Sequence, residues 1–108
     1  MEQIEIRMPE YIQQNARTKT RPVKKVEIEV PEYSPQYGVW PILEEKYILD
    51  VQIDTDNTIV ITADKGGLIS LARHLLTLSQ DEVPAGCHVH YDENILEDGS
   101  REFILCKV

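Results

Sequence analysis

The sequence predicts an α+β fold, in which a mainly antiparallel sheet carries one amphipathic helix packed on one face. Apolar and polar residues alternate in segments on both sides of a single helical pattern, residues 66–80. Turn residues Asp56 and Asn57 separate two of these segments, and a glycine-containing stretch separates two others. Hairpins on either side of one helix predict the element order β-ββ-α-ββ.

Three strands are expected before the helix. In KKVEIEV, residues 24–30, apolar residues alternate with charged ones, as in a half-buried strand. YILDVQID, residues 47–54, and TIVITAD, residues 58–64, are rich in β-branched residues, and Asp56-Asn57 suits a tight hairpin between them. Within 47–54 one face is expected to be apolar: Leu49, Val51 and Ile53.

The helix over GGLISLARHLLTLSQ, residues 66–80, is expected to be capped by Asp64 and to end before Pro84. Gly66-Gly67 lacks the spacing of a phosphate loop and favours close backbone packing instead. A helical wheel predicts a core-facing stripe: Leu68, Leu71, Ala72, Leu75, Leu76 and Leu78. The opposite side is polar and is expected to face solvent: Ser70, Arg73, His74, Thr77 and Gln80.

Two further strands are expected after the helix, CHVHYD (87–92) and REFILCKV (101–108), joined by ENILEDGS. Because side chains alternate along a strand, Val89 and Tyr91 are expected to face the core. The other face would carry His88, His90 and Asp92.

A chain of 108 residues fits a single domain, with residues 46–108 as a ββαββ core. Residues 1–45 are less regular, although IEIRM near the start is a candidate for an extra short strand. Their proline–aromatic segment, residues 31–41, suits either a long connection pinned by its aromatic residues or a docking arm for a partner. The aromatic residues in question are Tyr33, Tyr37 and Trp40.

The acidic charge is confined to one part of the chain. Residues 1–40 carry six basic and six acidic residues, whereas residues 41–108 carry five basic and thirteen acidic residues, which is the whole net charge of −8. An acidic surface disfavours nucleic acid and attracts a basic protein, although solubility alone would also explain it.

No apolar run is long enough to span a membrane, and the N-terminus lacks the pattern of a signal peptide, so we expect a cytoplasmic protein without membrane contact. Cys87 and Cys106 are too few for a disulfide scaffold and are expected to be small core thiols.

The motif CHVHYDE raises the question of a metal or catalytic site. His88, His90 and Asp92 could bind zinc, but a third imidazole is missing because His74 is expected on the far side of the helix. Cys87 and His88 point to opposite faces of a strand and cannot form a nucleophile–base pair. Ser70 and His74 are expected to lie on the solvent side of the helix, with no third group to orient them. We therefore expect no catalysis, no metal and no cofactor.

Five pieces in order, GLISLARHLLTLSQ, VPAG, HVHYDE, LEDGS and an apolar final strand, resemble the immunity protein 32 family of bacterial polymorphic toxin systems. The resemblance covers roughly residues 65–108. It implies an α+β fold, no catalysis and a protein partner, and it implies no catalytic or metal residues.

The resulting hypothesis is a cytoplasmic immunity protein that binds and neutralises a cognate toxin domain, with a basic toxin favoured. Two alternatives stay open: a small metal-dependent enzyme built on the histidine motif, or a structural or regulatory subunit that oligomerises through an open sheet edge. The oligomeric state is open, a homodimer included. The candidate contact residues are His88, His90, Asp92, Glu93, Glu97, Asp98, Tyr33, Tyr37 and Trp40.

Overall fold

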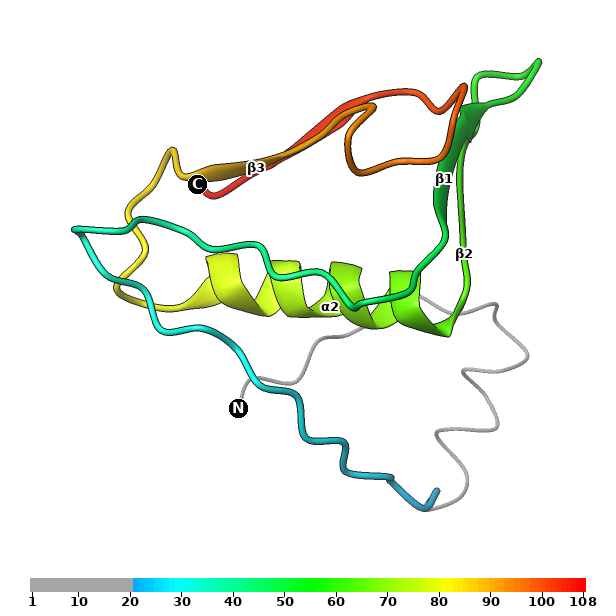
Figure 1. The fold of residues 1–108 in the computed structure, drawn as a ribbon. Coiled ribbons are helices and arrows are strands. Elements are labelled where there is room, and N and C mark those ends of the chain that lie inside the picture. The colour runs from blue at the N-terminus through cyan, green and yellow to red at the C-terminus, as the bar shows by residue number, and fades with distance from the viewer. Residues whose placement is uncertain (1–20) are drawn as a thin grey trace.

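The computed structural model describes residues 21–108 and contains one helix and two antiparallel hairpins in this range (Figure 1). The α+β class is therefore confirmed. The strands form two separate two-stranded sheets rather than one continuous sheet. The candidate strand IEIRM lies outside the described residues. The elements are β1 (Leu49–Ile53), β2 (Ile59–Ala63), α2 (Lys65–Ser79), β3 (His88–Tyr91) and β4 (Phe103–Cys106).

The first hairpin pairs β1 with β2 in a register that runs from Leu49 opposite Ala63 to Ile53 opposite Ile59. Asn57 adopts the left-handed conformation with φ 65°, as the turn prediction requires. The hairpin is thus confirmed.

A loop takes the place of a third strand along the other edge of β1. The amide of Glu97 donates to the Leu49 carbonyl at 2.9 Å, and the amide of Arg101 donates to the Val51 carbonyl at 2.7 Å. The Ser100 hydroxyl accepts from the Val51 amide at 3.2 Å. These bonds join the loop between β3 and β4 to the first hairpin and satisfy an edge that a lone hairpin would leave open.

The N-terminus of α2 is built for close backbone contact. The Asp64 carboxylate accepts from the amides of Gly67 at 2.8 Å and Ile48 at 2.9 Å, so it caps the helix and also binds the preceding chain. A Cβ atom on Gly66 would collide with the carbonyl oxygen of Lys46, and one on Gly67 with that of Ile48. The glycine pair therefore provides close packing, as expected.

The prediction that the leucine stripe of α2 faces the core is right for Leu78, which is buried, but wrong for most of the stripe. Leu68 is 57% exposed and Leu75 is 49% exposed, whereas Ser70 and His74 are fully buried. The buried residues of the helix are Gly67, Ser70, His74, Thr77 and Leu78.

The physical reason is that α2 packs against irregular backbone, residues 39–48, which runs along it (Figure 1). Such backbone needs hydrogen-bond partners that leucine cannot supply. The Ser70 hydroxyl accepts from the Glu44 amide at 2.8 Å, and the His74 ring lies 2.8 Å from the Ile42 carbonyl oxygen. The small polar face of the helix is therefore the one that is buried.

His74 lies at the centre of this polar contact, not on the solvent side as expected. Its Nε2 is 2.8 Å from the Ile42 carbonyl oxygen, and its Nδ1 is 2.6 Å from the Tyr91 hydroxyl. Because a carbonyl can only accept, Nε2 carries the proton and Nδ1 accepts from the tyrosine. Burial lowers the pKa of His74 below its ordinary value of 6.5, so the ring is neutral.

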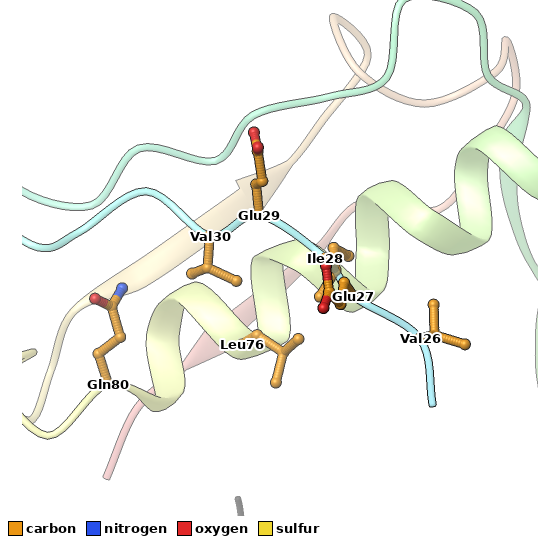
Figure 2. A pocket seen from close by; sticks show the side chains of 7 residues that line it. All are labelled: Val26, Glu27, Ile28, Glu29, Val30, Leu76 and Gln80. Atoms are coloured by element: carbon orange, nitrogen blue, oxygen red, sulfur yellow. The ribbon is translucent and has the colours of Figure 1, made fainter. Parts of the chain in front are cut away.

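Residues 24–30 do not form the predicted strand, and Val26 is 72% exposed. The segment lies beside a helix, whose backbone is bonded internally, so only side chains can hold it. Arg73 donates to the Glu29 carbonyl at 3.0 Å and Gln80 to the Pro31 carbonyl at 2.9 Å. The segment and α2 enclose a groove of about 560 Å³. Figure 2 shows the side chains that line it: Val26, Glu27, Ile28, Glu29, Val30, Leu76 and Gln80.

Candidate functional site

The second hairpin has one buried and one exposed face, and the exposed face is the candidate site. Val89 is 3% and Tyr91 1% exposed, while His88 and His90 are exposed. This alternation confirms the predicted orientation of the strand. Across the hairpin, Tyr91 stacks on Phe103 with ring centroids 4.3 Å apart, which fixes the inner face.

The outer face of β3–β4 combines imidazole rings with an apolar side chain. The register places His88 opposite Cys106 and His90 opposite Ile104, which is 55% exposed. The two histidine rings meet edge to face at 4.8 Å, and His88 Nδ1 donates to the Gly86 carbonyl at 2.9 Å. The face is therefore preorganised, and both histidines can reach a partner.

Cys106 was expected to be a core thiol, but it is exposed on this outer face. Cys87 is half-buried and lies one register step away, and both thiols are free.

Asp92 fixes the turn that follows β3. It is half-buried, and its carboxylate accepts from the Asn94 amide at 3.0 Å. Its carbonyl accepts from the amides of Ile95 and Leu96. A shallow depression of about 390 Å³ beside it is lined by His90, Tyr91, Asp92, Glu102, Phe103 and Ile104.

The loop between β3 and β4 displays four exposed carboxylates, those of Glu93, Glu97, Asp98 and Glu102. Its backbone is anchored, because Leu96 is buried and the Tyr47 hydroxyl donates to the Ile95 carbonyl at 2.7 Å. Partial burial and the charge of Glu97 raise the pKa of that tyrosine. The loop thus displays its acidic groups from an anchored backbone.

The proline–aromatic segment divides into an anchor and an exposed part. The Tyr33 amide donates to the Gln80 side chain at 3.2 Å, and the ring is half-buried against the core. Tyr37 is 81% exposed within a turn closed on the Ser34 carbonyl, and Trp40, which follows this turn, is 65% exposed. Only these two aromatic side chains are presented to a partner.

Within the described residues, neither a metal-binding set of three ligands nor a serine–histidine pair is assembled. Within residues 21–108 no three His, Cys, Asp or Glu side chains are grouped so that they could hold a metal ion. Ser70 and His74 are both buried, but they do not bond to each other. Ser70 bonds to the Glu44 amide, and His74 bonds to the Ile42 carbonyl and the Tyr91 hydroxyl.

Within residues 21–108, no helix has the length and apolar character needed to cross a membrane.

Sequence reasoning missed Glu102 and Ile104 as members of the site. Both are exposed on the side of β4 opposite Phe103, and Ile104 lies directly across from His90. The alternation in EFILC would have found them once Phe103 was placed in the core.

Comparison with known proteins gives one match. No curated protein and no solved structure matches the chain significantly. Residues 58–108 match the model of a family described as immunity protein 32. The matched part contains β2, α2, the second hairpin and its acidic loop. Over this range, somewhat less than half of the chain, the protein is similar to the immunity protein 32 family, which confirms the resemblance seen in the sequence.

Proposed function

We propose that this chain is a non-catalytic, cytoplasmic immunity protein that binds and neutralises a cognate bacterial toxin domain. The observation that carries the proposal is the family match, because it includes the whole second hairpin and its loop. An immunity protein acts by occupying a surface of its toxin, so a preorganised, exposed face is what the function requires.

The acidic loop supports a basic partner. Glu93, Glu97 and Asp98 are exposed on an anchored backbone, in the part of the chain that carries the entire net charge of −8. Carboxylates held in this way attract a cationic surface over distance and raise the association rate more than the final affinity.

The neighbouring outer face of β3–β4 would provide short-range recognition. His88 and His90 offer ring faces and ring nitrogens, and Ile104, opposite His90, offers an apolar contact. An apolar centre surrounded by polar groups is the usual layout of a protein interface. Tyr37 and Trp40 form a second candidate contact.

The test is coexpression with the toxin domain encoded beside this gene, together with association rates at low and high salt. Wild type should restore growth, and its association should slow as salt rises. The variant Glu97→Lys/Asp98→Lys should associate at least about tenfold more slowly at low salt, with a flatter salt dependence.

The matched control is Asp81→Lys/Glu82→Lys, which makes the same charge change in an exposed turn at the other end of α2. It should slow association much less. If wild type neither protects cells nor binds the toxin, the proposed function is wrong. If it protects but both variants associate equally, the acidic loop is not the contact, and Tyr37→Ala/Trp40→Ala is the next comparison.

A further inference from the structure

The outer edge of β2 has an unused set of backbone hydrogen-bonding groups. The backbone groups of Leu49 and Val51 bond to the loop on the far side of β1. In an antiparallel pair the backbone groups alternate in direction, so Asp50 and Gln52 are the residues of β1 that bond to β2. Their partners in β2 are Thr62 and Val60.

The remaining residues of β2, Ile59, Ile61 and Ala63, therefore direct their amides and carbonyls away from β1. The bonds just beyond the strand ends, from Asp64 to the Ile48 carbonyl and from Asp54 to the Thr58 carbonyl, fit the same alternation. Within residues 21–108, no backbone hydrogen bond reaches this outer edge of β2.

The edge is also apolar and unprotected. Ile59 is 66%, Val60 41% and Ile61 44% exposed. The strand IVITA contains neither charge nor proline, the two devices by which proteins usually keep exposed edges from pairing. Such a strand is suited to pair with another strand.

We propose that the occupant is a second copy of this chain, paired antiparallel along β2 with a twofold axis at Ile61. Ile61 then lies opposite its own counterpart, and Ile59 lies opposite Ala63. These are the residues whose backbone groups point outward, so every outward group between them finds a partner. The opposition of isoleucine to alanine also sets a large side chain against a small one.

Charge favours a second copy at this place. Two chains of net charge −8 repel each other, so contact is favoured over a surface without carboxylates, and β2 has none.

The apolar face would also become continuous. Ile59 and Ile61 lie on the same side of the hairpin as their cross-strand partners Ile53 and Val51. Val51 is buried, but Ile53, Ile59 and Ile61 are at least 42% exposed. Pairing joins the two hairpins into four strands whose apolar sides adjoin.

The test is the molar mass of the full chain in a dilution series, measured by light scattering or sedimentation. Wild type should change from twice the chain mass to the chain mass on dilution. Ile61→Lys places two ammonium groups side by side at the axis and should raise the dimer dissociation constant at least about 100-fold. Thr62→Lys adds the same charge opposite Val60 of the other copy and should have much less effect.

Charge exchange identifies the register. Ile61→Glu alone should also be monomeric, and a mixture of Ile61→Glu with Ile61→Lys should form a dimer again, because only a twofold axis at residue 61 brings these side chains together. Circular dichroism of each variant verifies the fold. A wild-type chain that stays monomeric, or a mixture that does not reassociate, overturns the proposal. Protection of β2 amides from exchange only when the toxin is added would assign this edge to a strand of the toxin instead.

Discussion

Tyr91→Phe tests which face of α2 holds the fold together. The substitution removes one hydroxyl, whose bond to His74 Nδ1 is 2.6 Å long, and it keeps the ring that stacks on Phe103. Tyr91 is 1% and His74 0% exposed, so water does not replace the lost donor. A buried acceptor without a partner costs about 1–3 kcal/mol, and we expect a loss of stability in that range.

Leu75→Ala is the matched comparison on the opposite side of the helix. Had the leucine stripe been core, this change would cost about 2–5 kcal/mol. Because Leu75 is 49% exposed, we expect less than about 1 kcal/mol. Urea unfolding of both variants with equal m-values measures the two losses. A larger loss for Leu75→Ala than for Tyr91→Phe would refute the packing of α2 described above.

Three other predictions follow from the same contacts. Gly67→Ala should destabilise the protein by about 1–3 kcal/mol although alanine is the better helix former, because its methyl group would collide with the Ile48 carbonyl. The control Ala72→Gly, at an exposed helix position, should cost only about 1 kcal/mol, and thermal unfolding measures both losses. Stability should fall as pH is lowered below about 6.5, because burial lowers the pKa of His74 and the unfolded chain then binds the extra proton; His74→Gln should flatten this part of the pH profile. Asp64→Ala should lower the melting temperature more than Asp56→Ala, because its carboxylate accepts from both Gly67 and Ile48, and equal shifts would contradict this double role.

Local patterns predicted the elements correctly wherever a local rule decides the outcome. The Asp56-Asn57 turn, the Asp64 cap and the alternation that buries Val89 and Tyr91 all depend on neighbours in sequence. The orientation of α2 depends instead on what lies against it. Hydrophobicity assigned the leucines to the core, but the neighbour is irregular backbone, which selects side chains that can hydrogen-bond.

The same reason explains the errors at Ser70, His74 and residues 24–30. A histidine on a polar helix face looks solvent-exposed unless the carbonyl of Ile42 and the hydroxyl of Tyr91 are known to be nearby. Alternation in residues 24–30 describes side chains only, and a strand also needs a neighbour with free backbone groups, which a helix cannot provide. Both errors come from long-range contacts that no window of sequence contains.

The two proposed surfaces lie on opposite sides of β1, and this makes them separable. The acidic loop bonds to one edge of β1, whereas β2 covers the other edge and directs its free groups further away. A lysine at position 61 should therefore abolish self-association and leave protection against the toxin unchanged. Reversal of Glu97 and Asp98 should do the opposite, slowing toxin binding while the mass in solution stays that of the dimer. Growth assays and light scattering on both variants measure the two effects. If Ile61→Lys folds normally and yet loses protection, the toxin contacts either β2 or the dimer as a whole, and the two surfaces are parts of one interface.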